Sequence, residues 1–84
     1  MTIDTSNIDA HETTDIRNLH NSFSQNGAYP TVRWVRQRGG WAIYGNGQAV
    51  YATPDKKPVI LRTVAEADHL LQSNGIFKYM VDGT

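Results

Sequence analysis

The sequence predicts an α+β fold: a small antiparallel sheet of three to four strands packed on one C-terminal helix, with a short final strand and an additional N-terminal helix. Three observations lead to this class. Apolar residues alternate with a period of two between residues 31 and 53. A helical period, opened by a capping signal, begins at residue 63. The chain has 84 residues, which is the length of a single domain.

Residues 1–12 are mostly polar and acidic, and Ile3 and Ile8 stand alone among them. A segment of this composition cannot bury enough apolar surface to offset the entropy that it loses on ordering. We therefore predict a disordered acidic tail over residues 1–12 and a single α+β domain over residues 13–84.

A first helix is predicted to begin at about Thr14. Its apolar face follows the spacing i, i+3, i+4 and i+7, at Ile16, Leu19, His20 and Phe23. The pattern ends at Asn26-Gly27, and a glycine in this place is typical of a helix C-cap.

Three strands and two tight turns are predicted in the middle of the chain. The strands are Thr31–Arg38, Trp41–Tyr44 and Gln48–Thr53. The turns are Gly39-Gly40 and Asn46-Gly47, the second of type I′ because that turn favours asparagine followed by glycine.

The pattern of side chains decides which face of each hairpin is buried. Closing the second hairpin on Asn46-Gly47 pairs Ile43 with Val50 and Trp41 with Ala52 on one face. A one-residue slip would exchange the two faces, since side chains alternate along a strand.

The register of the first hairpin depends on the length of its turn. A two-residue turn places Trp34 and the strand arginines beside Trp41, whereas a three-residue turn places Val35 there. We favour the three-residue turn, because it buries Val35 and leaves Trp34, Arg36 and Tyr44 together on the opposite face.

A loop, a helix and a strand complete the domain. The loop at residues 53–58 contains two prolines, and the apolar run Val59–Leu61 suits a buried strand. Thr63 and Glu66 have the spacing of a capping box, and the helix that they open ends at Asn74-Gly75. Its apolar stripe is Val64, Ala67, Leu70 and Leu71. Ile76–Val81 then alternates as a final strand.

Composition excludes several classes of protein. The chain has no cysteine, so it has neither disulfides nor a Cys-based zinc site. It has no apolar run of the roughly 20 residues that a membrane-spanning helix needs, and because its first residues lack a basic start and an apolar run, we expect no signal peptide. We predict a cytoplasmic protein with no membrane partner. Small domains without disulfides often gain stability by pairing, so we also expect a homodimer.

Charge is distributed unevenly, although its total is zero. Residues 1–30 carry one basic and four acidic side chains, residues 31–62 carry six basic and one acidic, and residues 63–84 carry one basic and three acidic. The basic middle segment is rich in arginine and contains Trp34, Trp41, Tyr44 and Tyr51. Such a segment is typical of a phosphate-binding surface.

Double-stranded DNA is the partner that this segment favours. The predicted DNA-binding residues are Arg33, Trp34, Arg36, Arg38, Lys56, Lys57 and Arg62. Arginine can hold a phosphate or the edge of guanine with two hydrogen bonds, and a β-ribbon fits the major groove. Cations on a half-exposed sheet can instead simply keep an edge strand soluble.

The aromatic residues allow a second interpretation. Trp34, Tyr44 and Tyr51 could stack on unpaired bases, although aromatics at alternating positions more often form a core or a dimer interface. With flanking arginines they could also form a hot spot for another protein. A protein-interaction module, such as an inhibitor or assembly subunit, is therefore the alternative to DNA binding.

No pattern in the chain indicates catalysis. His11, His20 and His69 have no metal-ligand spacing, and Glu66 is already explained by helix capping. Gly45-Asn46-Gly47 lies inside a hairpin rather than between a strand and a helix, so it is no phosphate-binding loop. We predict no catalytic residue, metal, cofactor or small-molecule substrate, and hence no enzyme.

Several runs of residues carry a resemblance to known families: Val32–Arg38, Gly40–Tyr44, Ala49–Tyr51 and Thr63–Ala67. In layout they resemble the DNA-binding domains of plant ethylene-response factors and the arm-binding domains of phage integrases. In those families a three-stranded sheet enters the major groove, which implies contacts here from Arg33, Trp34, Arg36 and Arg38. The loop at residues 54–58 and the run after it depart from their pattern.

The chain also resembles small bacterial plasmid-encoded DNA-binding proteins whose dimers are similar to the Arc repressor superfamily. That resemblance implies a homodimeric transcriptional regulator, although the order of one strand followed by two helices is missing here.

Overall fold

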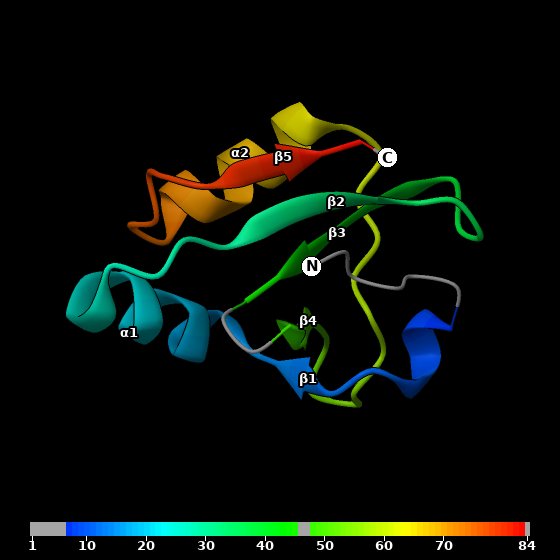
Figure 1. The fold of residues 1–84 in the computed structure, drawn as a ribbon, viewed down its shortest axis with the longest axis horizontal. Coiled ribbons are helices and arrows are strands. Elements are labelled where there is room, and N and C mark those ends of the chain that lie inside the picture. Colours follow the sequence, from blue (N-terminus) through cyan, green and yellow to red (C-terminus); the bar gives the residue numbers. More distant parts are fainter. Residues whose placement is uncertain (1–6, 46–47, 84) are drawn as a thin grey trace.

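The computed structural model describes residues 7–45 and 48–83, and it confirms the α+β class. A mixed five-stranded sheet is combined with two α-helices (Figure 1). The elements are the 3₁₀ helix η1 (Ile8–Ala10), β1 (Thr13–Thr14), α1 (Ile16–Asn26), β2 (Thr31–Val35), β3 (Gly40–Tyr44), β4 (Val50–Tyr51), α2 (Val64–Ser73) and β5 (Met80–Asp82). Within the described ranges, no helix is long and apolar enough to span a membrane.

The sheet has more strands than the three to four predicted, and it is not purely antiparallel. Its order is β1-β4-β3-β2-β5, so β1 and β5 form its two edges (Figure 1). Each edge strand pairs in parallel with its neighbour, whereas the three central strands are antiparallel. β1 was missed because it is two residues long, too short for any periodicity to show.

Both helices begin and end close to the positions that the sequence predicts. The Asp15 carboxylate accepts a hydrogen bond from the Asn18 N–H at 2.8 Å, and Gly27 ends α1 with a φ of 65°. Before α2, the Thr63 hydroxyl accepts from the Glu66 N–H at 3.1 Å. The Glu66 carboxylate accepts from the Arg62 N–H, one residue earlier than in a standard capping box.

The two helices cover one face of the sheet and form the main core. Its buried members are Leu19, Val32, Ile43, Ala67, Leu71 and Ile76. Trp41 and Tyr51 pack against this core from the same face of the sheet. The predicted stripe of α2 therefore faces the sheet, as amphipathic spacing requires.

A second core covers the opposite face. It contains Ile8, Val35, Ala42, Tyr44 and Val50, and all five are buried. Ile8 is only 1% exposed, so the prediction of a disordered tail is wrong for residues 7–12. Ile8 covers an apolar face of the sheet, and the contacts of Asp9 with Arg38 and of His11 with Tyr44 attach the same segment. Residues 1–6 of the predicted tail lie outside the described residues.

The register of the first hairpin differs from the favoured prediction. Its turn has four residues, Arg36–Gly39, and Trp34 lies opposite Trp41. Val35 therefore faces the second core, opposite Gly40. Gly40 lies in strand β3, and the position requires glycine because a Cβ there would lie 2.8 Å from the Leu61 carbonyl oxygen. The glycine pair thus gives room for a crossing segment and not only for a turn.

The second hairpin is shifted by one residue from the predicted register. Tyr44, rather than Ile43, lies opposite Val50. The Gly45 N–H donates to the Ala49 carbonyl at 2.8 Å, which makes the loop longer than two residues. The predicted turn at Asn46-Gly47 lies outside the described residues. The shift buries Tyr44 beside Val50 in the second core. Val50 and Tyr51 therefore exchange their predicted faces, whereas Trp41 and Ile43 keep theirs.

Residues 53–62 cross one end of the sheet and lead to α2. Val59–Leu61, predicted as a buried strand, is partly buried and extended but forms only an isolated bridge, between Leu61 and Trp41. A second bridge joins Ala52 to Pro58. The last strand is also shorter than predicted, because β5 begins at Met80 rather than at Ile76.

Candidate interaction surface

Arg33 is held inside the protein. Its side chain is 7% exposed, and its Nη2 lies 2.9 Å from Asp82 Oδ2 on the neighbouring strand β5. Its Nε and Nη1 are buried and have no hydrogen-bond partner among the described residues. Arg33 therefore fastens β5 to β2 and is not placed to contact DNA, contrary to its predicted role.

Arg38 is paired at the surface. Its Nη2 donates to both carboxylate oxygens of Asp9, at 2.6 and 2.7 Å, so the acidic N-terminal segment meets the basic turn. The other four predicted cations are exposed: Arg36, Lys56, Lys57 and Arg62. The ion pairs within the described ranges involve only Arg33 and Arg38.

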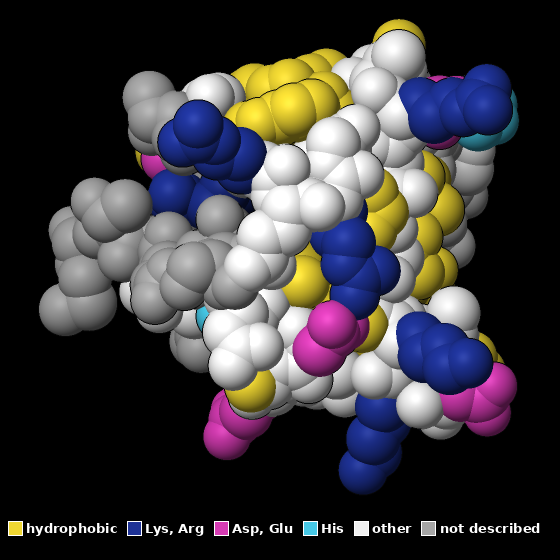
Figure 2. Space-filling model, turned by 90° about the vertical axis from the view of Figure 1, so that its right-hand side faces the viewer, with side chains coloured by type: hydrophobic (Ala, Val, Ile, Leu, Met, Phe, Trp, Pro, Cys, Tyr) yellow, Lys and Arg dark blue, Asp and Glu magenta, His cyan; other side chains and the backbone are white. Residues whose placement is uncertain are grey.

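Figure 2 shows the end of the molecule where the β2–β3 turn lies. The Lys and Arg side chains on this face are separated by uncharged surface, and several lie directly beside Asp or Glu. Cations do gather here, but they do not form one continuous basic patch. The local field is weaker than the charge count of residues 31–62 implies.

The predicted aromatic cluster is divided between the two faces of the sheet. Trp34 and Trp41 form an edge-to-face pair with ring centroids 5.4 Å apart, on the face of the helices. Tyr44 is 1% exposed in the second core, and its hydroxyl lies 3.2 Å from His11 Nδ1. Core residues therefore cover both faces of the central strands.

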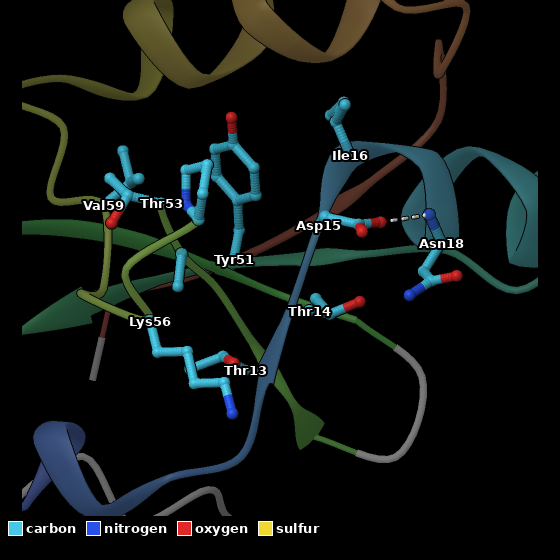
Figure 3. Close-up of a pocket in the computed structure, with 11 residues that line it drawn as sticks. Thr13, Thr14, Asp15, Ile16, Asn18, Tyr51, Thr53, Lys56 and Val59 are labelled. Atoms are coloured by element: carbon cyan, nitrogen blue, oxygen red, sulfur yellow. Dashed lines mark hydrogen bonds between the residues drawn. The ribbon is translucent and has the colours of Figure 1, made fainter.

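A hollow of about 500 Å³ lies between β1, β4 and the loop that follows (Figure 3). Threonines and Lys56 supply its polar groups, and the Lys56 side chain extends towards Thr13. Asp15 also lines it, but its carboxylate caps α1. None of the polar lining residues is buried. Within the described ranges, no cluster of acidic residues and histidines could hold a metal ion.

Exposed apolar side chains gather near the edge of the sheet at β5. Among the residues that the structure describes, the exposed large apolar ones are Tyr29 at 48%, Phe77 at 67%, Met80 at 59% and Val81 at 51%. We refer to these four side chains, together with the outer edge of β5, as the β5 patch. Each of them lies on β5 or in a segment next to β2 or β5, so the apolar surface and the sheet edge coincide.

Aromatic contacts with α1 and one hydrogen bond with α2 hold the β5 patch in place. Phe77 packs edge to face on Phe23 of α1, with centroids 5.1 Å apart, and Tyr29 lies 6.4 Å from the same ring. The Tyr79 hydroxyl donates to the Asp68 carboxylate of α2 at 2.8 Å. This bond lowers the pKa of Asp68 and raises the pKa of Tyr79. The patch is therefore a structured surface, built on both helices.

The hydrogen bonds of β5 show which way its main chain points. The Met80 N–H donates to the Pro30 carbonyl at 2.9 Å, and Met80 and Asp82 lie beside Thr31 and Arg33 in a parallel ladder. Successive residues of a strand point their main-chain groups to opposite sides. The N–H and C=O of Val81 therefore point outward, where none of the described strands lies.

Sequence reasoning missed the β5 patch. The alternation over residues 76–81 puts Phe77, Tyr79 and Val81 on one face of the predicted final strand, without indicating whether that face is buried or exposed. Periodicity alone cannot tell a central strand from an edge strand, so nothing in the pattern indicated exposure. The run of apolar residues broken only by Lys78 was the available signal.

Comparison of the chain with protein-family models, with curated proteins and with solved structures gives no significant match. The resemblances drawn from the sequence therefore stay predictions, and the case for a function depends on the surfaces described above.

Proposed function

We propose that this chain is a protein-interaction module that binds another polypeptide through the β5 patch. The observation that carries the proposal is the coincidence of an open strand edge with exposed apolar side chains, Met80 at 59% and Val81 at 51%. An extended segment that pairs with such an edge gains main-chain hydrogen bonds, and its alternate side chains gain apolar contacts.

The lack of protection along the edge of β5 gives independent support. Soluble proteins usually protect an edge strand with charges, prolines, a bulge or a covering segment, because an open apolar edge promotes aggregation. β5 has only Asp82 as a charged residue, and its carboxylate is turned towards Arg33 at 2.9 Å. An edge left in this state is typical of a strand that is covered by a partner.

The surroundings of β5 suit an extended apolar partner. Phe77 and Tyr29 pack against the ring of Phe23, so their own rings are already ordered and lose little conformational entropy on binding. Lys78 lies over the Tyr29 ring at 5.9 Å and adds a cation beside the apolar surface. Aromatic anchors with a charged rim are typical of hot spots.

Selection from a random-peptide display library tests this proposal without knowledge of the natural partner. We expect the wild-type protein to enrich peptides with alternating apolar residues, and Val81→Lys to weaken their binding at least tenfold, because it puts a charge on the edge. The matched control is Thr13→Lys on the edge strand β1, which should leave binding unchanged. Failure of monomeric protein to enrich any peptide, or equal binding by the Val81→Lys variant, would contradict the proposal.

Binding of double-stranded DNA is a second candidate, supported by the four exposed cations at Arg36, Lys56, Lys57 and Arg62. If about four phosphates are neutralised, the slope of log K against log salt should be about −3.6, from about 0.9 per contact. The double variant Arg36→Ala, Arg62→Ala should then halve this slope, while the β5 variants should leave it unchanged. No binding to random duplex DNA at low salt would dispose of this candidate.

A further inference from the structure

We propose that the partner at the β5 patch is a second copy of this chain, joined by antiparallel pairing of β5 with β5 of the partner subunit around a two-fold axis at Met80. The inference rests on the proposed function and specifies its partner. It joins two five-stranded sheets into one continuous sheet across an isologous interface.

The main chain of β5 offers the groups that such pairing needs. The Val81 N–H and C=O point outward, as the Met80 hydrogen bond to Pro30 requires. No backbone hydrogen bond within the described chain engages Tyr79, which precedes the strand. An axis at Met80 brings Tyr79 opposite Val81 of the partner subunit. These two residues then form a hydrogen-bonded pair on each side of the axis.

Pairing of opposite charges favours this register over the two registers with the axis one residue earlier or later. With the axis at Met80, Lys78 lies opposite Asp82 of the partner subunit. The symmetry repeats this contact, so one ion pair lies on each side of the axis. An axis at Val81 would instead set Met80 against Asp82 of the partner subunit. An axis at Tyr79 would set Lys78 against Met80 of the partner subunit. Only the first arrangement pairs charge with charge and apolar with apolar.

In the same register, the apolar side chains of one subunit meet apolar side chains of the partner subunit. Met80 is 59% exposed and would meet Met80 of the partner subunit on the axis, on the face of the sheet that carries Arg33. Val81 is 51% exposed and lies on the face of α2, where it would meet Tyr79 of the partner subunit. Methionine suits a contact with its own symmetry copy, because its flexible side chain adapts to the space available.

Arg33 fixes the position of the residue that Lys78 would meet. Its Nη2 holds Asp82 Oδ2 at 2.9 Å from the inner side of the strand. A carboxylate has about four lone-pair sites, so it can accept from an ammonium group of the partner subunit as well. The buried ion pair thus places a negative charge at a defined position along the edge.

Single cysteines test the register directly, since the chain has no cysteine of its own. Residues facing each other across the axis in a non-hydrogen-bonded pair have Cα atoms about 4.5 Å apart, which is within disulfide range. Met80→Cys should therefore form a covalent dimer under mild oxidation at least tenfold faster than Val81→Cys. The control Thr13→Cys, on the other edge, should crosslink no faster than Val81→Cys. Equal rates, or fastest crosslinking at Val81, would overturn the proposal.

Sedimentation equilibrium of the full chain gives the second test. We expect a species of twice the 9.4 kDa chain mass, and at least a tenfold weaker dimer in Lys78→Glu, which would face Asp82 of the partner subunit. Lys78 is exposed, so this variant should fold normally. Arg17→Glu, which changes the same charge on α1, should dimerise as wild type. A monomer at all concentrations, or an unchanged dimer in Lys78→Glu, would contradict self-pairing.

The two proposals fail in different ways. A monomeric chain that still enriches peptides dependent on Val81 would overturn the second copy as partner and leave the interaction module standing. A chain that neither dimerises nor enriches peptides would overturn both.

Discussion

The two edges of the sheet have similar geometry and opposite surfaces. β1 and β5 are both short, both outermost and both parallel to their neighbours (Figure 1). β1 consists of two threonines between Glu12 and Asp15, so its surroundings are polar and charged. β5 exposes Met80 and Val81 beside further apolar residues. The fold therefore protects one edge and leaves the other suited to a partner.

The two edges are also held by different forces. β1 follows η1, which is attached through Ile8 in the second core, so packing keeps that edge in place. β5 is attached through the buried contact between Arg33 and Asp82, together with its ladder to β2. The variants below separate these contributions and are ordered by the size of the expected effect.

Ile8→Ala should have the largest effect on stability. Ile8 is 1% exposed, and removal of a buried isoleucine side chain beyond Cβ costs about 3 kcal/mol. Urea denaturation should show this loss, with about 1 kcal/mol for the control Ile8→Val. A loss below about 0.5 kcal/mol in Ile8→Ala would mean that the N-terminal segment does not help to hold the β1 side of the fold.

Asp82→Asn should destabilise the β5 edge by about 2 kcal/mol, because it leaves the buried Arg33 charge without its carboxylate. The matched control is Asp9→Asn, which removes a similar bond to Arg38 at the surface and should cost less than about 1 kcal/mol. Chemical denaturation of both variants measures the difference. Equal losses would show that the buried pair is not what fastens β5.

Proline substitutions test the direction of the main chain in β5. Met80→Pro removes the N–H that donates to Pro30 and should cost about 1 kcal/mol or more. Val81→Pro removes an outward N–H and should preserve the fold while it weakens association at least tenfold. Circular dichroism measures whether each variant is folded, and sedimentation equilibrium measures how strongly it associates. The reverse pattern would place the free edge on the other side of the strand.

Tyr79→Phe should have the smallest effect, and a pH-dependent one. The Tyr79 hydroxyl, followed by Gln72, lowers the pKa of Asp68, so the contribution of Asp68 to stability is present above its ordinary pKa of 3.8. It is lost as the pH falls below that value. The hydrogen bond to Asp68 raises the pKa of Tyr79, so the contribution of Tyr79 is lost only above about pH 10.

Thermal unfolding of Tyr79→Phe and wild type across this range provides the measurement. The variant should unfold at a slightly lower temperature near pH 7, and the two curves should converge at pH 2. A constant difference from pH 2 to pH 7 would show that the bond to Asp68 is not its cause.

The sequence predicted those elements that local chemistry determines. Thr63, Glu66 and Asn74-Gly75 place the ends of α2 to within a residue, because capping groups act over one turn. Register was predicted less well, since it depends on contacts between distant segments. The close approach of Leu61 to Gly40 is one such contact, and it turns an apparent turn glycine into a strand residue.

The candidate site was predicted less well than the fold. Charge counting identifies cations but not their partners, and two of the six predicted cations are held by Asp9 and Asp82, which are distant in sequence. The apolar residues at Phe77 and Val81 were identified as a strand face, but their exposure follows from the edge position of β5. Strand order in a sheet is set by tertiary packing and is not readable from a local pattern.

Amide hydrogen exchange of Val81 and Thr13, followed by NMR at low and high protein concentration, tests the central claim most directly. Both N–H groups point away from the sheet, one at each edge. We predict that protection of Val81 rises with concentration as pairs form, while Thr13 exchanges at the same rate throughout. Val81 exchange that is independent of concentration, or protection that rises at Thr13 instead, would contradict the assignment of β5 as the interaction edge.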